Sequence, residues 1–278
     1  MSSGAGCPVA AVNNSNHLRV YTQDPSGGIR ESAYENRWYP GGIIANCKSG
    51  SPLAATSLAL DSEAAHDATS GWYTGALNNN NFQVAANSTV GAAYLAGTQA
   101  LRVYAQSPDN SIQEYGWDEW QTLSNLGAAL PGTAIAVTSF SQPNQAIRLY
   151  FQDTQNNLVE MAHDSDSGWN PGSFSVPNAS PGTALAVTTT EDGSIHVYYG
   201  GSNNSTLEKV HDSNSGWYDG AFSQTGMPGS QVAAINWGTG SGLNIRVYFQ
   251  QPQSVPGVSE YQYVNGNWTA GQIPIPPA

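Results

Sequence analysis

One arginine, one glutamate and one tryptophan recur in the same order along this chain. In the first copy Arg19 lies in a short apolar stretch, and Glu31 and Trp38 follow it. The later copies are Arg102, Glu114 and Trp120; Arg148, Glu160 and Trp169; and Arg246, Glu260 and Trp268. A guanidinium donates hydrogen bonds in a rigid fork, a carboxylate accepts them, and an indole offers an apolar face with one N–H. Sugars have a hydroxyl-rich rim and a less polar face, so the repeat predicts a multivalent binding protein.

An ion pair between adjacent strands is the alternative explanation for each arginine and glutamate. Such cross-strand pairs stabilise a sheet by only about 0.2–1 kcal/mol. Only 10% of the chain is charged, and the repeated pair lies beside aromatic residues. The repetition therefore favours a ligand site.

Composition narrows the fold and the partners. Short β-branched and aromatic runs lie between clusters of Gly, Asn, Asp and Ser, which is typical of an all-β protein. A chain of 278 residues is long enough to bury a core without metals or disulfides. The net charge of -12, with only 8 Lys and Arg residues, argues against nucleic-acid binding.

The repeat is longer than the arginine, glutamate and tryptophan alone. Each unit opens with a strand of small residues, expected at 8–12, 52–56, 90–94, 134–138, 184–188 and 232–235. An arginine strand, a glutamate strand and a strand with Gly-Trp follow. The marker tryptophans are Trp38, Trp72, Trp120, Trp169, Trp217 and Trp268, and the later ones are roughly fifty residues apart, a period typical of propellers. Residues 1–278 are therefore predicted to form one six-bladed β-propeller of four-stranded antiparallel blades.

The second unit is irregular. After the opening strand at 52–56 the chain runs almost directly to Glu63, about fourteen residues sooner than the fifth unit would. The arginine strand is the missing part, and a short loop cannot connect the parallel neighbours left behind. Either this blade is remodelled, or the sequence as given lacks a loop.

The ordered repeat resembles the Aleuria-type fungal fucose-specific lectins over nearly the whole chain. The resemblance rests on the Leu/Ile-Arg-Val-Tyr strands, the glutamate strands, the Asp-x-x-x-Gly-Trp segments, 233–238 and the tail 275–278. It implies a six-bladed propeller that binds L-fucose between adjacent blades, with arginine and glutamate from one blade and aromatic residues from the next. The implied sites are Arg19 and Glu31 with His66 and Trp72; Arg102 and Glu114 with His163 and Trp169; Arg148 and Glu160 with His211 and Trp217; and Arg246 and Glu260 with Tyr34 and Trp38.

Two of the implied sites depart from the pattern. His196 replaces arginine beside Glu208, opposite Tyr263 and Trp268, so weaker affinity or altered specificity is expected there. Glu63 has lost its arginine, although Trp117 and Trp120 would still face it, so this site is expected to be empty or very weak. His66, His163 and His211 stand where the family often has an aromatic residue. They either stack on a sugar face or belong to a repeated His-Asp turn at the surface.

Enzyme and scaffold functions are the alternatives to a lectin. The Asp-x-x-x-Gly-Trp turns at 164–169 and 212–217 are similar to the Asp-box turns of sialidases, which are also propellers, but Asp and Gly are ordinary turn residues. Glycosidases need two carboxylates with different roles in one site, whereas these acidic residues recur once per unit. No enzymatic activity is expected. A protein-interaction scaffold would not need the repeated set.

The remaining expectations concern partners, location and the cysteines. The resemblance implies fucosylated glycans and glycoproteins as partners, no metal or other cofactor, and a homodimer. No membrane insertion is expected, and the N-terminus shows no signal-like pattern, so a cytoplasmic location, or non-classical export to the cell surface or spore wall, is expected. Cys7 and Cys47 lack metal-site spacing. They are expected to be free and mostly buried, with one disulfide as the alternative.

Overall fold

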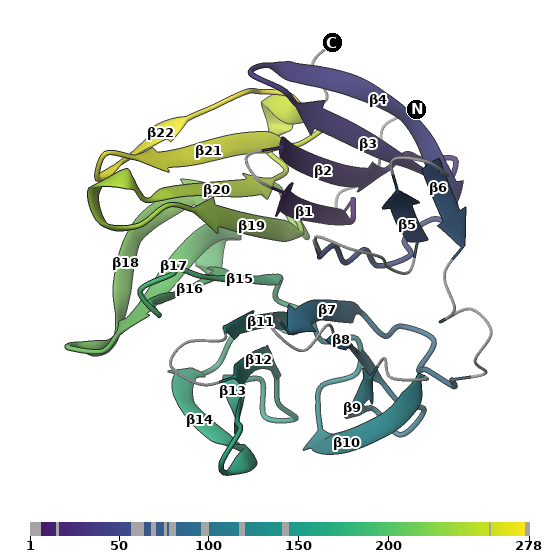
Figure 1. Cartoon of the computed structure of the whole chain (residues 1–278), viewed down its shortest axis with the longest axis vertical. Coiled ribbons are helices and arrows are strands. Elements are labelled where there is room, and N and C mark those ends of the chain that lie inside the picture. The colour runs from purple at the N-terminus through teal and green to yellow at the C-terminus, as the bar shows by residue number, and fades with distance from the viewer. Residues whose placement is uncertain are drawn as a thin grey trace.

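The chain forms antiparallel sheets that radiate as blades around a common axis, as the computed structural model shows (Figure 1). The structure describes residues 7–14, 17–56, 64–67, 71–74, 77, 82–95, 100–116, 120–140, 145–255 and 257–275. In this part of the chain there are five sheets of four strands and one of two strands. An all-β propeller of four-stranded antiparallel blades, as the sequence predicted, is confirmed.

Consecutive strands pair in each blade, so the chain runs outward from the axis and then crosses to the next blade. The blades comprise β1 (Val9–Asn14), β2 (His17–Gln23), β3 (Gly28–Tyr34) and β4 (Trp38–Asn46); β7 (Val90–Leu95), β8 (Ala100–Gln106), β9 (Ser111–Gly116) and β10 (Gln121–Ala128); β11 (Ala136–Phe140), β12 (Ala146–Gln152), β13 (Leu158–Asp164) and β14 (Gly168–Val176); β15 (Leu185–Thr189), β16 (Ile195–Gly200), β17 (Ser205–Asp212) and β18 (Gly216–Thr225); and β19 (Val232–Trp237), β20 (Asn244–Phe249), β21 (Ser259–Val264) and β22 (Asn267–Ala270). Short 3-10 turns occur at Ser202–Asn204, Gly240–Gly242 and Pro252–Ser254.

The second unit differs from the other five. Its described strands are β5 (Ala64–Asp67) and β6 (Gly71–Thr74), which form a two-stranded sheet. No strand forms at 52–56, where the sequence predicted an opening strand. The prediction of six four-stranded blades is therefore not confirmed: five are seen, and the second unit is short, as its sequence indicated.

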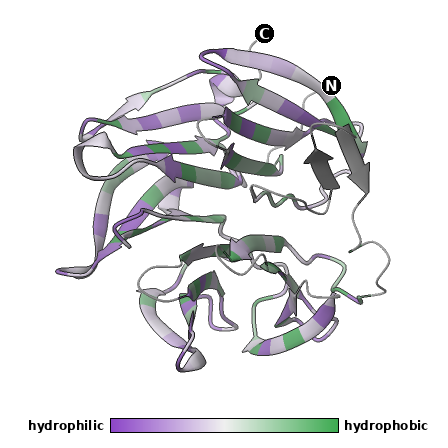
Figure 2. Ribbon diagram, in the orientation of Figure 1, coloured by the Kyte–Doolittle hydropathy of each residue, from purple (hydrophilic) through white to green (hydrophobic). Residues whose placement is uncertain are grey.

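Apolar side chains fill the space between neighbouring blades. One cluster joins Leu158 and Phe174 of one blade to Val197 of the next, and a second joins Phe222 to Val247. Strands in the middle of a blade are covered on both faces, so β12 is buried at nearly every position. Figure 2 shows hydrophobic and hydrophilic residues mixed along these strands. The core is thus divided among the contacts between blades, and these contacts set the spacing of any site there.

Small residues let the first strands of the blades meet at the axis. A Cβ on Gly91 would lie 3.0 Å from Ile135 Cγ2 on the next blade. A hollow of about 260 Å³ lies on the axis and one of about 170 Å³ lies beside it, both lined by the first strands of the four-stranded blades together with residues of 50–56. The segment 50–56 therefore occupies the gap between β1 and β7 although it is not a strand.

A buried glutamine (Gln23, Gln106 or Gln152) fastens three of the crossings between blades. Gln152 has no exposed surface; its Nε2 donates to the carbonyls of Ala179 and Ser180, and its Oε1 accepts from the N–H of Gly182. Gln106 makes the same contacts with Leu130 and Gly132. These bonds satisfy the backbone of a turn that no strand covers.

The first and last blades meet beside the two ends of the chain. Cys7 N–H donates to Gln250 Oε1 at 3.2 Å, and Val9 shares an apolar cluster with Ile275, which itself exchanges two backbone hydrogen bonds of 2.8 Å with Val258. Both cysteines are free; Cys7 is buried as expected, but Cys47 is exposed, so the expectation of a mostly buried thiol is wrong for Cys47. Among the described residues, no helix is long and apolar enough to cross a membrane.

Replacing Gln152 by leucine should lower the free energy of unfolding by about 2–4 kcal/mol, because it leaves buried carbonyls and one N–H without partners. Chemical denaturation measures this change. Gln155→Leu, at an exposed loop position, is the matched control and should change stability little. Equal effects of the two substitutions would contradict the proposed role of the glutamine.

Candidate carbohydrate site between blades

The pleat of the strands places the arginine, a tyrosine and the glutamate on one face of each blade. Arg148 and Tyr150 are two residues apart on β12, so their side chains share a face. Tyr150 pairs directly with Glu160 on β13. The same cross-strand pairs are Tyr21 with Glu31, Tyr104 with Glu114, Tyr198 with Glu208 and Tyr248 with Glu260.

In five of the six units the opposite face of the blade carries the marker tryptophan and its cross-strand partner. His163 follows Glu160 by three residues and so points to the other face. It pairs directly with Trp169. The equivalent pairs are His66 with Trp72, His211 with Trp217, Tyr263 with Trp268 and Tyr34 with Trp38. Each space between two blades, here called a seam and named by its arginine or by His196, therefore brings together different faces of neighbouring blades.

The arginine and glutamate of each seam face each other without a hydrogen bond. The distance from arginine Nε to the nearest glutamate oxygen is 3.8 Å at Arg19, 3.6 Å at Arg102, 3.8 Å at Arg148 and 3.9 Å at Arg246. A closed ion pair would bring these atoms to about 2.7–2.9 Å. The pair is therefore held slightly open, which differs from the simple salt bridge that was the alternative explanation.

Each arginine is fixed by its own backbone. Nη1 donates to the carbonyl of the preceding residue in all four seams, at 2.9–3.1 Å. The guanidinium is thus oriented before any ligand arrives, and its side chain is 12–27% exposed. This leaves Nε as a donor that every arginine seam offers, whereas Nη2 already donates to a second carboxylate in the Arg19 and Arg148 seams.

Each glutamate is fixed by the tyrosine opposite it. The tyrosine hydroxyl donates to the carboxylate at 2.8–3.2 Å in all five described seams. Four of these tyrosines are fully buried. Burial, followed by the nearby negative carboxylate, raises the pKa of Tyr150, so the hydroxyl keeps its proton and remains a donor.

A β-bulge at the glutamate completes its environment. The pairing of β13 with β14 shifts between Val159 and Met161, on either side of Glu160. The bulge frees the N–H of Phe174, which donates to Glu160 Oε2 at 3.2 Å. Phe222 N–H donates to Glu208 in the same way, and Gln272 N–H donates to Glu260.

A glycine makes room for the carboxylate at the bulge. A Cβ on Gly172 would lie 2.1 Å from Glu160 Oε2. Gly220 and Gly271 would meet Glu208 and Glu260 at 2.3 Å. In the β7–β10 blade Leu123 takes the place of this glycine.

The tryptophan of the next blade packs edge-on against the tyrosine. The ring centroids of Tyr104 and Trp169 are 6.0 Å apart, at an interplanar angle of 82°. The pairs Tyr150–Trp217, Tyr198–Trp268 and Tyr248–Trp38 repeat this geometry at 6.1–6.2 Å and 82–88°. Trp169 Nε1 also donates to Glu114 at 3.2 Å. The structure thus brings together the residues that the sequence assigned to three of the complete sites.

The histidines lie inside the seams rather than on free turns. His163 and His211 are partly buried, with ring centroids 5.3 Å and 5.2 Å from those of Trp169 and Trp217. Tyr34 and Tyr263 hold the same position beside Trp38 and Trp268. They therefore widen the aromatic wall beside the tryptophan, although whether they touch a sugar stays a prediction.

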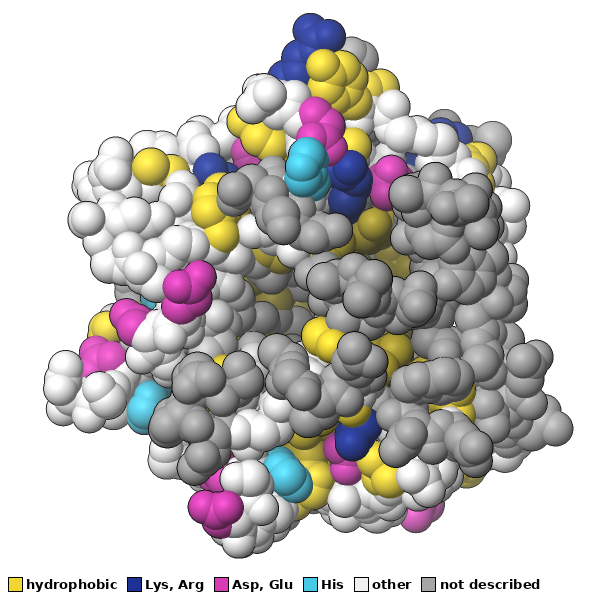
Figure 3. Space-filling view, viewed as in Figure 1, with side chains coloured by type: hydrophobic (Ala, Val, Ile, Leu, Met, Phe, Trp, Pro, Cys, Tyr) yellow, Lys and Arg dark blue, Asp and Glu magenta, His cyan; other side chains and the backbone are white. Residues whose placement is uncertain are grey.

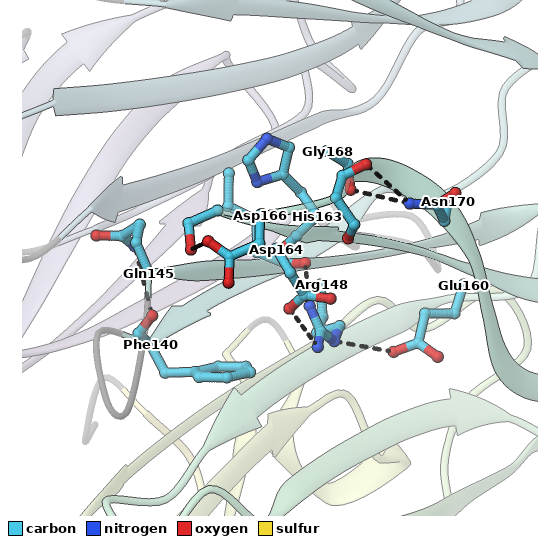
Figure 4. Close-up of polar contacts among 12 residues, drawn as sticks. Phe140, Gln145, Arg148, Glu160, His163, Asp164, Asp166, Gly168 and Asn170 are labelled. Carbon is cyan, nitrogen blue, oxygen red and sulfur yellow. Dashed lines mark hydrogen bonds and ion pairs between the residues drawn. The ribbon is translucent and has the colours of Figure 1, made fainter.

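The seams differ in what else contacts the arginine. Nη2 of Arg148 donates to Asp164 at 2.9 Å, and the guanidinium lies 5.2 Å from the centre of the Phe140 ring (Figure 4). Nη2 of Arg19 donates to Glu35 at 2.7 Å. Arg246 lies 4.7 Å from the centre of the Trp237 ring instead.

In the His196 seam the basic side chain and the glutamate are within hydrogen-bonding distance, whereas in the arginine seams they are held apart. His196 Nδ1 lies 2.9 Å from Glu208 Oε1, within hydrogen-bonding distance. The two side chains are only 12% and 3% exposed. This geometry agrees with the expectation of an altered site there.

Part of the predicted set lies outside the described residues. Glu63 and Trp117 are outside them, and for His66 and Trp72 only the backbone pairing is described. Of the complete site predicted around Arg19, the structure therefore describes the side chains of Arg19 and Glu31 but not those of the opposite wall. Trp120 is buried in an apolar cluster with Leu101 and Tyr115.

On the face shown in Figure 3, the charged side chains of the described residues lie at several separate places rather than in one patch. Within the described part of the chain, no three His, Cys, Asp or Glu residues form a group that could hold a metal ion. The repeated arrangement offers several similar hydroxyl-binding sites, each with donors, acceptors and an aromatic wall.

Comparisons with known proteins agree with this arrangement. The fungal fucose-specific lectin family model matches residues 6–278. The chain belongs to this family. A fucose-specific lectin of Aspergillus fumigatus is 40% identical over 301 residues, covering 97% of this chain and 96% of the relative.

Solved structures of the family show the same fold. The SapL1 lectin in complex with alpha methyl fucoside has a TM-score of 0.87 and 38% identity, covering 99% of this chain and 98% of that one. The Aleuria aurantia lectin, described as a six-bladed β-propeller, has a TM-score of 0.80 and 26% identity, covering 97% and 95%.

Sequence reasoning missed three sets of residues. The tyrosine two positions after each arginine was visible as a repeat but was read as part of the strand. The glycine three positions after five of the six marker tryptophans, as in Trp169 and Gly172, also repeats. Glu35 and Asp164 each lie sixteen positions after their arginine, a spacing that becomes meaningful only once the strands are paired.

Tyr150→Phe should weaken the Arg148 seam without unfolding the protein. It removes one hydrogen bond to a buried carboxylate, which is worth about 1.5–3 kcal/mol. Chemical denaturation should show a loss of that size, whereas Tyr39→Phe at an exposed position should show none. An unchanged stability would contradict the role assigned to the tyrosine.

Glu260 should titrate above the ordinary glutamate pKa of 4.5. Its burial raises the pKa, while the Gln272 N–H and then Arg246 lower it. Because the folded-state pKa is raised, the stability contributed by Glu260 is largest at low pH and is lost as pH rises through that pKa. Carbon-detected NMR measures the midpoint, with Glu260→Gln identifying the resonance. Arg246→Ala should raise the midpoint further, and a midpoint at or below 4.5 would contradict the prediction.

Proposed function

We propose that this protein is a metal-independent lectin that binds L-fucose and fucosylated glycans at several seams. The observation that carries the proposal is the open arginine–glutamate pair, repeated with an aromatic wall from the next blade. Sugar hydroxyls fit between Nε and the carboxylate, which are held in place 3.6–3.9 Å apart and do not satisfy each other. Fucose also carries a methyl group, which suits the aromatic wall. Relatives named fucose-specific lectins, and the fucoside complex of a close structural neighbour, support the choice of sugar.

A lectin accounts for the geometry better than a glycosidase. The carboxylates of the seams recur in similar environments on different blades, whereas glycosidases need two unlike carboxylates in one site. The chain belongs to a family of lectins, carbohydrate-binding proteins that are not enzymes.

Several weak seams would act together on a glycan-coated surface. Linking binding events raises avidity by about 10²–10⁴ when the spacing of the sugars lets more than one seam engage. The repeat around the axis directs the seams toward different sides of the molecule (Figure 1). A homodimer would multiply this effect, and glycoproteins with several fucosyl branches would be the preferred partners.

We also propose that the ring is completed as a six-bladed propeller, with 50–56, β5 and β6 forming a reduced second blade. The segment 50–56 lines the same axial hollows as the first strands of the other blades. The six-bladed Aleuria aurantia lectin supports this count. The alignment with the Aspergillus fumigatus relative extends over 301 positions, more than the 278 residues of this chain, so this chain is shorter than the relative at some point within the alignment. A cytoplasmic, cell-surface or spore-wall location stays a prediction.

Calorimetric titration with L-fucose, galactose and sialic acid tests the function. Heat with fucose well above that with the other two sugars is expected, and no heat with fucose, or equal heat with all three, would contradict the proposal. Arg148→Ala should reduce the number of fucose sites by one. Arg30→Ala is the control, because Arg30 pairs with Asp24 away from the seams, and it should leave the number unchanged. Loss of all binding by a folded Arg148→Ala protein would contradict independent seams.

A further inference from the structure

The Arg19, Arg148 and Arg246 seams fall into two electrostatic classes. In the Arg19 and Arg148 seams a second carboxylate, from Glu35 or Asp164, takes a hydrogen bond from arginine Nη2. These carboxylates are partly exposed, at 38% and 47%. They therefore lie at the solvent-exposed rim of their seams, the side from which a ligand has to enter.

The Arg246 seam has no acidic residue at this position. Asp164 pairs with Ala146, two residues before Arg148. Tyr263 pairs with Ile245, so the next residue, Val264, lies in the place of Asp164. An apolar side chain thus stands where the other two seams have a negative charge.

Arg246 keeps an outer donor that nothing else in the seam uses. Its Nη1 donates to the Ile245 carbonyl, its Nε faces Glu260 at 3.9 Å, and its planar group stacks over Trp237. Within the described residues, Nη2 makes no hydrogen bond or ion pair. The wall opposite, Tyr34 and Trp38, is uncharged.

These contacts give the net formal charge of the ionised groups in each seam. Arg148 with Glu160 and Asp164 sums to one negative charge, as does Arg19 with Glu31 and Glu35. Arg246 with Glu260 sums to zero. A negative group arriving beside the sugar is repelled at the rim of the first two seams and meets an open guanidinium N–H in the third.

We propose that the Arg246 seam accepts fucosyl glycans that carry an anionic group, a sulfate or a carboxylate, on the sugar next to fucose, and that Glu35 and Asp164 exclude such glycans from their seams. This inference rests on the proposed fucose-binding function. The net charge of -12 disfavours anionic ligands everywhere, so the comparison has to be made between seams of the same protein.

Two multiply substituted variants, each keeping a single arginine seam, allow the Arg246 and Arg148 seams to be compared. One carries Arg19→Ala, Arg102→Ala and His196→Ala together with Arg148→Ala, and so keeps Arg246. The other carries the same first three substitutions with Arg246→Ala, and so keeps Arg148. Each is titrated with the Lewis x trisaccharide, with its form sulfated on galactose, and with its sialylated form, which carries a carboxylate.

The expected result is a difference in selectivity between the two proteins. With Arg148 alone, the anionic forms should bind at least about threefold more weakly than the neutral form, a discrimination that shrinks as salt is added. With Arg246 alone, the sulfated or the sialylated form should bind as tightly as the neutral form or more tightly. Comparing the two anionic forms shows which group the seam takes.

Matched substitutions at the rim complete the test. Asp164→Asn in the Arg148 protein should remove the discrimination, and Val264→Asp in the Arg246 protein should create it. Equal discrimination against the anionic trisaccharides by both single-seam variants, or none by either, would overturn the inference while leaving fucose binding established. Failure of the neutral trisaccharide to bind either folded protein would overturn the proposed function at these seams, and the inference with it.

Discussion

A hydrogen bond from a buried tyrosine to a glutamate is the interaction on which each seam depends. It holds the carboxylate on the blade that supplies the arginine, yet keeps the two charged groups 3.6–3.9 Å apart. The same tyrosine ring is the surface against which the tryptophan of the next blade packs. One residue therefore fixes the acceptor and packs against the tryptophan that forms the aromatic wall.

A bulge opposite the glutamate explains how a carboxylate is tolerated at this depth in the β11–β14 and β15–β18 blades. Inside a regular sheet an additional acceptor would find every N–H already paired. The bulge releases one N–H, and the glycine beside it leaves space for the side chain, so the buried charge is hydrogen-bonded on two sides. In the His196 seam the carboxylate is bound in the same way, but the imidazole closes onto it, which shows how one substitution removes the opening.

The repeat does not make the seams equal. The backbone geometry is shared, but residues at the ends of the strands differ: an acidic side chain contacts Arg19 and Arg148, whereas an aromatic ring backs Arg246. A blade is constrained most strongly where it packs on its neighbours and least at its rim. Variation at the rim changes the electrostatic environment of a site without disturbing the propeller.

The sequence by itself determined the all-β class, the repeat, and which residues share a face, because these follow from a two-residue period and short-range turns. It also predicted which tryptophan meets which glutamate, through the family resemblance, and it located the irregular second unit. The tyrosine–glutamate bond, the bulge and the second carboxylate at Arg148 were decided by the tertiary structure. Each depends on strand register or on the distance between blades, and these are set by packing between residues far apart in the chain. The lack of a strand at 52–56 has the same origin, since an opening strand forms only where a second strand is present to pair with it.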